Sequence, residues 1–192
     1  MIKLFYDLET TGLNFKNHSI HRLAGMVEID NEIVESFDLK LKPHPRAKIT
    51  PEALTAGGVT EAQIMKYPDM KHAYAKFSKM LAKYVNRYNK RDRIKLVGYN
   101  NRFFDDQFLR MLFLLSDDNY FEAWFWSDSS DTLVLASEYL ENRRRNMPDF
   151  KLKSVARELG LRVEEDKLHD GVYDVMLTRQ IYRIVTGKDI EI

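Results

Sequence analysis

The sequence of 192 residues contains no cysteine, which excludes disulfides, thiol chemistry and zinc sites built on cysteine. It also lacks any run of about 18 apolar residues, the length that a membrane-spanning helix needs. The first residues have the pattern of a strand rather than of a basic or apolar leader. These absences predict a soluble cytoplasmic protein that does not enter a membrane.

An excess of charge is missing as well, since 30 basic residues stand against 29 acidic ones and the net charge is +1. Such a balance by itself says little about a nucleic-acid partner. No repeat, low-complexity tract or linker interrupts the chain. Because 44% of the residues are hydrophobic, the chain can fill one core, and we expect a single domain over residues 1–192.

What the sequence does have is a pair of acidic residues at the end of an apolar segment. Asp7 and Glu9 follow an alternating stretch that begins at Ile2, and residues 10–12 supply a turn. Side chains two residues apart on a strand share a face, so the two carboxylates should converge. Such neighbours repel each other unless a hard divalent cation neutralises them. An isolated Asp-x-Glu is more simply a solvated strand end, so the metal hypothesis needs acidic partners elsewhere.

Two later segments offer such partners. Asp105 and its neighbour Asp106 lie between an apolar strand and a helix start, at the strand end where α/β sheets place their ligands. His169 and Asp174 open an amphipathic stretch. On one continuous helix these two side chains would lie about 140° apart. They can meet only if His169 belongs to the preceding loop, a break that Gly171 would permit.

The periodicity predicts a mixed sheet flanked by helices. Strands are expected at residues 2–7, 22–29, 33–41 and 94–97, with a hairpin turn at Asp30-Asn31. A capping box from Thr60 to Gln63 predicts a short helix there. Longer helices are expected at residues 73–85, 106–115, 131–140, 152–159 and 172–185. The segment before residue 60 is expected to be irregular. Strands first and alternating elements afterwards favour an α/β domain.

Three motifs, in chain order, resemble those of the DEDDh 3′-5′ exonucleases, the DnaQ-like superfamily with a ribonuclease-H-like fold. They are Asp7-x-Glu9, Asn101-x-x-Phe104-Asp105-x-x-Phe108 and His169-x-x-x-x-Asp174. Each motif is weak alone, whereas the ordered triple is specific, and the resemblance extends over nearly the whole chain. The second motif is most similar to that of bacterial exonuclease I, which degrades single-stranded DNA but has large further domains for which this chain has no room.

The resemblance implies a metal-dependent 3′-5′ exonuclease that releases nucleoside 5′-monophosphates by a two-metal-ion mechanism, using Mg²⁺ or Mn²⁺. Asp7 would bridge both ions, Glu9 and Asp174 would hold the ion that carries the nucleophilic water, and Asp105 would support the other. His169 would be the general base, since imidazole exchanges protons near neutral pH. The neighbours Asp106 and Asp170 are rivals of Asp105 and Asp174, although Asp170 is equally suited to cap a helix.

The resemblance also implies substrate contacts from Thr10, Leu13 and Asn101, with Leu13 wedged against the terminal base. Single-stranded nucleic acid is the expected partner, with DNA preferred over RNA. Two departures from the family pattern, Asn100 in place of histidine and Gly171 in place of alanine, bear on substrate preference rather than on activity. The alternatives are an exoribonuclease that resembles oligoribonuclease or ribonuclease T, and a proofreading module with a polymerase or repair partner. The protein is expected to be a monomer or a homodimer.

Overall fold

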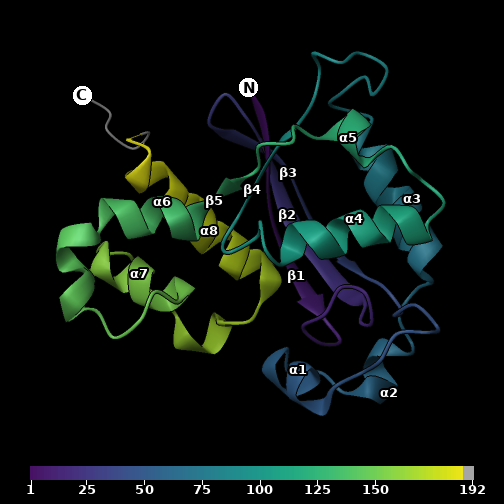
Figure 1. Ribbon diagram of the computed structural model, residues 1–192, viewed down its shortest axis with the longest axis horizontal. Coiled ribbons are helices and arrows are strands. Elements are labelled where there is room, and N and C mark those ends of the chain that lie inside the picture. The colour runs from purple at the N-terminus through teal and green to yellow at the C-terminus, as the bar shows by residue number, and fades with distance from the viewer. Residues whose placement is uncertain (188–192) are drawn as a thin grey trace.

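Five strands form one mixed sheet in the order β3-β2-β1-β4-β5 (Figure 1). The computed structural model describes residues 1–187. Strand β1 pairs antiparallel with β2, and β2 with β3, whereas β1 and β4, and β4 and β5, are parallel. The strands are β1 (Ile2–Thr10), β2 (Ile20–Ile29), β3 (Glu32–Lys40), β4 (Lys95–Gly98) and β5 (Ser130–Asp131). Because parallel neighbours need crossover connections, helices lie between β3, β4 and β5 in the chain.

The first hairpin has the predicted turn. Asp30 and Asn31 both have positive φ angles, 50° and 71°, which is the backbone of a type I′ turn. The prediction for the first strand was too short, since β1 continues to Thr10. Glu9, which lies beyond the predicted end of the strand, is therefore paired within the sheet as Asp7 is, and it lies opposite Arg22 of β2. The continued pairing fixes the direction of both carboxylates.

The helices agree with the periodicity to within a few residues, with two exceptions. They are α1 (Pro51–Ala56), α2 (Glu61–Ile64), α3 (Met70–Leu81), α4 (Asp105–Leu115), α5 (Phe121–Trp124), α6 (Thr132–Tyr139), α7 (Leu152–Glu158) and α8 (Gly171–Val185), with 3₁₀ turns at Glu141–Asn146 and Glu165–Lys167. The expectation of an irregular segment before residue 60 was wrong, because Pro51 at the first helical position starts α1. The short helix α5 was also missed, and among the strands so was the short β5. The predicted capping box at Thr60 is confirmed.

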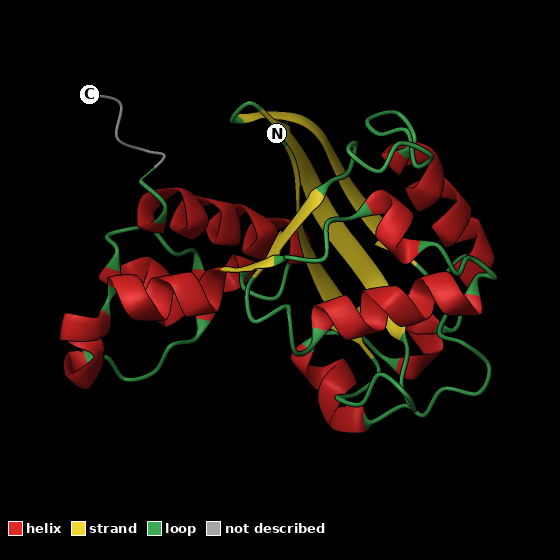
Figure 2. Cartoon of the chain, turned by 45° about the horizontal axis from the view of Figure 1, so that its top comes forward, coloured by secondary structure: helices red, strands yellow, loops and turns green. Residues whose placement is uncertain are grey.

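Both faces of the sheet are covered, as Figure 2 shows. On one face Leu4 and Tyr6 pack with α3, α4 and α5, and on the other Phe5 packs against Val175 and Tyr182 of α8. Leu4, Phe5 and Tyr6 are therefore all buried, on alternating faces of the sheet, and each such side chain contributes about 1.5–3 kcal/mol. Asp7 and Glu9 continue the Phe5 face. They consequently point to the side of the sheet that α8 covers.

A buried ion triad fastens α8 to this face. Glu28 of β2 accepts hydrogen bonds from Lys3 Nζ at 2.5 Å and from Arg179 Nε at 2.8 Å, and its side chain is 1% exposed. Removing one partner of such a group typically costs about 3–5 kcal/mol. The triad fixes the position of α8, and with it the first turn that carries Asp174. Among residues 1–187, no helix combines the length and the apolar character that crossing a membrane requires.

Candidate active site

Four carboxylates from three separate segments meet at one end of the sheet. Asp7 and Glu9 come from β1, Asp105 is the first residue of α4, just after β4, and Asp174 lies in the first turn of α8. Burial raises the pKa of Asp7 well above its ordinary value, and the charges of Glu9 and Asp174 raise it further. Burial and then the charge of Asp7 likewise raise the pKa of Asp105. The fold thus brings the predicted acidic residues together.

The same crowding affects the other two carboxyl groups. Burial, and next the charge of Asp174, raises the pKa of Glu9 to about 7. The pKa of Asp174 is raised to about 6, chiefly by burial, although His169 opposes the shift. Asp174 Oδ1 is buried and has no hydrogen-bond partner among the described residues. The ionised cluster is therefore poorly compensated by the protein alone.

The donor chemistry of this cluster fits hard divalent cations. Mg²⁺ and Mn²⁺ prefer oxygen ligands, and all four groups are carboxylates. A cation would favour their ionised forms and would supply a partner for Asp174 Oδ1. Among the described residues, no three Asp, Glu or His side chains already stand in the geometry of a metal site. The assignment of Asp7, Glu9, Asp105 and Asp174 as metal ligands therefore stays a prediction.

The structure separates Asp105 from its neighbour Asp106. Asp106 lies in a hydrogen-bond network, in which its Oδ1 accepts from the Tyr6 hydroxyl and from Asn101 Nδ2, and its Oδ2 accepts from Ser129 Oγ at 2.5 Å. Tyr6 belongs to the face that packs on α4, whereas Asp7 belongs to the α8 face. Asp106 therefore makes structural hydrogen bonds on the face of the sheet that α4 covers, and Asp105 is the residue of this pair that faces Asp7.

His169 stands in the loop before α8, as the sequence required for it to meet Asp174. Its backbone amide donates to Asp174 Oδ2 at 3.2 Å, and its side chain is exposed. The expectation that Gly171 provides the break was wrong, because the positive φ of 68° belongs to His169 itself. Gly171 has another role: a Cβ there would stand 2.9 Å from Ala24 Cβ. The missing side chain lets the start of α8 approach β2.

Arg22 is a residue of this site that the sequence reasoning missed. It donates to Asp38 Oδ1 and Oδ2 at 2.8 and 2.9 Å and to Asp170 Oδ2 at 3.2 Å. Its positive charge opposes the rise in the pKa values of Asp7, Glu9 and Asp174 without cancelling it. Only the pairing of β1 with β2, which sets Arg22 opposite Glu9, reveals its position. Arg22 thus partly neutralises the cluster and joins it to α8.

Asp170 acts as the N-cap of α8. Its Oδ1 accepts from the amides of Val172 and Tyr173 at 3.1 and 3.2 Å, while Oδ2 pairs with Arg22. Both oxygens are therefore occupied by structural contacts. Of the two rivals for the acidic position in the third motif, Asp174 is the one with a free buried oxygen.

The three expected substrate contacts differ in their exposure. Leu13 is 83% exposed in the loop after β1. Thr10 is buried, with its Oγ1 donating to the Gly12 carbonyl at 2.9 Å. Asn101 is fully buried and donates to Asp106. In this arrangement Leu13 is open to a ligand, while Thr10 and Asn101 hold the turns beside the cluster. The substrate roles of all three stay predictions.

A cavity of about 600 Å³ adjoins His169 and Asp174. It runs toward the start of α7, and its lining includes the aromatic rings of Tyr99 and Phe150 and the side chains of Lys151 and Lys153. Sequence reasoning did not single out these lysines, since lysines beside a predicted helix are usually solvated. The mixture of rings and cations beside an acidic cluster suits a nucleotide.

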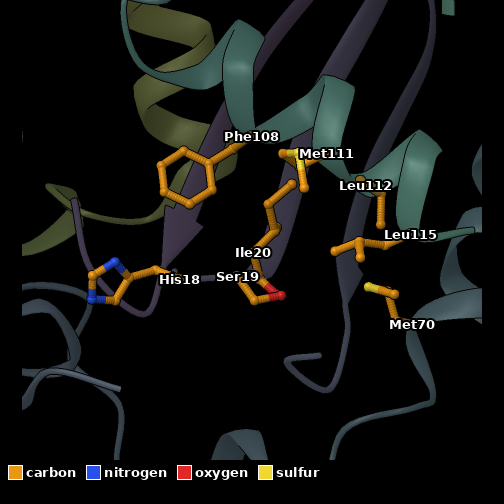
Figure 3. A pocket seen from close by; sticks show the side chains of 8 residues that line it. All are labelled: His18, Ser19, Ile20, Met70, Phe108, Met111, Leu112 and Leu115. Carbon is orange, nitrogen blue, oxygen red and sulfur yellow. The ribbon is translucent and has the colours of Figure 1, made fainter. Parts of the chain in front are cut away.

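A second hollow has no such character. Figure 3 shows it between α4 and the beginning of β2, where Phe108 and Leu112 face Ile20. Its volume of about 10 Å³ is roughly that of one water molecule. It is too small to hold a nucleotide.

A mixed sheet with converging carboxylates, an exposed histidine and a nucleotide-sized cavity is typical of nucleases with a ribonuclease-H-like fold. Residues 4–182 match the family model RNase_T, described as "Exonuclease". Since this match spans most of the chain, the protein belongs to that exonuclease family, whose DEDDh members are 3′-5′ exonucleases that hydrolyse phosphodiester bonds.

Solved structures with the same fold include complexes of E. coli exonuclease I. The zinc-bound form of its complex with single-stranded DNA has a TM-score of 0.77 and 21% identity, covering 99% of this chain and 41% of that one. The complex with a dT13 oligonucleotide has a TM-score of 0.74 and 21% identity, covering 98% and 41%. This chain therefore spans about two fifths of the matched exonuclease I chain. A search of curated proteins returned no match.

Proposed function

We propose that this protein is a divalent-metal-dependent 3′-5′ exonuclease that removes nucleoside 5′-monophosphates from single-stranded DNA. The observation that carries the proposal is the convergence of Asp7, Glu9, Asp105 and Asp174, whose pKa values are all raised chiefly by burial, with the charges of neighbouring carboxylates adding to each shift. A fold without a use for cations would gain stability by replacing such a cluster with neutral side chains. The ordered motifs and the exonuclease family support the same conclusion.

The residues of the chain divide the chemistry among them. When bound, two divalent cations would activate the attacking water and stabilise the leaving oxygen. The four carboxylates would hold these ions, and Asp174 Oδ1 is the atom that lacks a partner in the protein. His169, exposed at the rim of the cavity, would accept the proton of the attacking water.

In this proposal the 3′ end of the nucleic-acid strand occupies the cavity beside His169. Lys151 and Lys153 would meet phosphate oxygens, while Tyr99 and Phe150 offer rings for a base or a sugar. Leu13, which is exposed after β1, would contact the terminal base. Polarity from the 3′ end and the preference for DNA are proposed from the family and from the single-stranded DNA that exonuclease I holds in its complexes.

The proposal is tested by a time course with single-stranded DNA, duplex DNA and RNA, each labelled at the 5′ or the 3′ end. Wild-type protein with Mg²⁺ or Mn²⁺ should release the 3′ label first and as a mononucleotide, and EDTA should stop the reaction. Asp7→Asn should be inactive. Glu138→Gln is the matched control, because this carboxylate is exposed on α6, outside the cluster. Full activity of Asp7→Asn would contradict the metal-dependent mechanism. Early release of a 5′-labelled mononucleotide would contradict the 3′-5′ polarity. A faster reaction with RNA would instead identify an exoribonuclease.

A further inference from the structure

Two neighbouring loops concentrate positive charge that the net charge of the chain conceals. Residues 11–19 follow β1 and residues 41–50 connect β3 to α1; together they are called the basic double loop below. Neither loop contains an aspartate or a glutamate, in a chain that has 29 acidic residues. Their basic side chains are those of Lys16, His18, Lys42, His44, Arg46 and Lys48.

Hydrogen bonds to and from backbone atoms hold the two loops together. Thr11 is the centre of this contact: its Oγ1 donates to the Lys48 carbonyl at 2.7 Å, and its own carbonyl accepts from Thr50 N at 2.9 Å. Lys48 N donates to the Asn17 carbonyl at 2.7 Å, and His44 N donates to Ser19 Oγ at 3.1 Å. The charges therefore stand on one joined surface rather than on two independent loops.

Three of the cations on this surface have no acidic partner. Lys16, Arg46 and Lys48 are exposed. None of them takes part in any of the ion pairs found among the described residues. Lys16 Nζ lies over the Phe15 ring instead, 5.9 Å from the ring centroid. By contrast, Arg22 and Lys83 are paired with carboxylates. Unpaired cations on an ordered surface create a local positive potential even where the net charge is near zero.

The basic double loop is continuous with the acidic cluster. It begins at Thr11, two residues after Glu9 on β1, and it includes the exposed Leu13. Its second loop leads directly into α1, and at the end of α1 a Cβ placed on Gly57 would stand 3.2 Å from Glu9 Oε2. In Figure 1 the purple loop after β1 lies at the same end of the molecule as α1 and α2. A strand whose end occupies the cluster can therefore reach this surface.

We propose that the basic double loop binds the sugar-phosphate backbone of the nucleic-acid strand, beyond the nucleotide that is being removed. The inference rests on the proposed function, since it assigns the surface to the substrate of that site. Contacts to phosphate carry no sequence information, so the surface would increase affinity for strands of any sequence. Its contribution would fall as salt concentration rises, because binding releases counterions from the strand.

The test compares two triple variants made in the inactive Asp7→Asn protein, so that binding is measured without degradation. One carries Lys16→Gln, Arg46→Gln and Lys48→Gln. The control removes the same charge through Lys76→Gln, Lys79→Gln and Lys90→Gln, at exposed positions away from the loops. Fluorescence anisotropy with a labelled dT12 strand in Ca²⁺, at 50 to 300 mM salt, gives the affinity and its salt dependence. Thermal unfolding verifies that every variant is folded.

The double-loop variant should bind about ten- to a hundred-fold more weakly at 0.1 M salt, and the slope of log affinity against log salt should fall by about 2, or about 0.7 for each lost phosphate contact. The control should keep the parent slope. Replacing distal phosphates of the strand with neutral methylphosphonates should weaken the parent and leave the double-loop variant unchanged.

Each other outcome overturns the inference in a recognisable way. Equal affinity of the double-loop variant and its parent would refute it while leaving the proposed function intact. Equal losses in both triple variants would mean that only net charge matters. Binding of the parent Asp7→Asn protein to anionic lipid vesicles or to a polyglutamate peptide, but not to dT12, would assign the basic double loop to a different partner. Failure of the wild type to degrade any strand would instead count against the proposed function.

Discussion

Glu9→Gln should make the metal-free protein more stable while abolishing its activity. The folded protein holds Glu9 among buried carboxylates, and its pKa is raised to about 7 from an ordinary 4.5. Ionised Glu9 is therefore unfavourable in the fold above neutral pH. Glutamine keeps the shape of the side chain and removes the charge, so it relieves this cost and at the same time removes a proposed metal ligand.

The size of the effect follows from the pKa difference. A shift from 4.5 to about 7 corresponds to at most about 3 kcal/mol. Because Glu9 is partly exposed, solvent screens part of its interactions, and we expect about 1–2 kcal/mol. For a domain of this size that raises Tm by about 2–8 °C.

The pH dependence has a definite sign. A carboxyl group whose pKa is raised by folding binds its proton more tightly in the folded state, so its favourable contribution is complete below about pH 4.5 and is lost as pH rises through about 7. Glu9→Gln should therefore exceed the wild type in stability at pH 8, and the difference should shrink toward pH 5.

Differential scanning calorimetry of both proteins in EDTA between pH 5 and 8 measures this difference, with Glu138→Gln as the control. Addition of Mg²⁺ at pH 8 should stabilise the wild type more than the variant, because ligand binding to the folded state raises its stability. A variant less stable than the wild type at pH 8, or equal stabilisation of both by Mg²⁺, would refute the reasoning.

Three further predictions concern single residues. Asp105→Asn should lose activity without loss of stability. Asp106→Asn leaves one of three hydrogen-bond donors without its acceptor, so it should lower the free energy of unfolding by about 1–3 kcal/mol in urea titrations. The opposite ranking would reverse the assignment of Asp105 as the metal ligand and Asp106 as the structural residue. His169→Ala should fold, keep its stabilisation by Mg²⁺ and turn over about 10²–10⁴ times more slowly, and wild-type turnover would mean that the base lies elsewhere. Burial, and next the charge of Arg22, lowers the pKa of His21 from 6.5 to about 4, so folding loses up to about 3 kcal/mol as pH falls through this range. His21→Leu should lose less stability than the wild type between pH 7 and 4, and parallel acid unfolding curves would contradict this.

Local patterns were sufficient for much of the fold. The positive-φ turn at Asp30-Asn31 and the cap at Thr60 depend on residues close together in the chain, and both are present. The convergence of Asp7 and Glu9 follows from the two-residue period of a strand, which is the same in every sheet. The end of β1 could not be predicted in this way, because its last residues are held by pairing with β2.

The sequence by itself determined the order of the motifs, the family they indicate and the candidate carboxylates, because these depend on residue identity and on backbone periodicity. Only the tertiary structure decided that Asp106 turns toward Tyr6, that Arg22 lies opposite Glu9, and that two acid-free loops join into one surface beside the site. These relations link residues far apart in the chain. They arise from sheet register and helix packing, which no local pattern specifies.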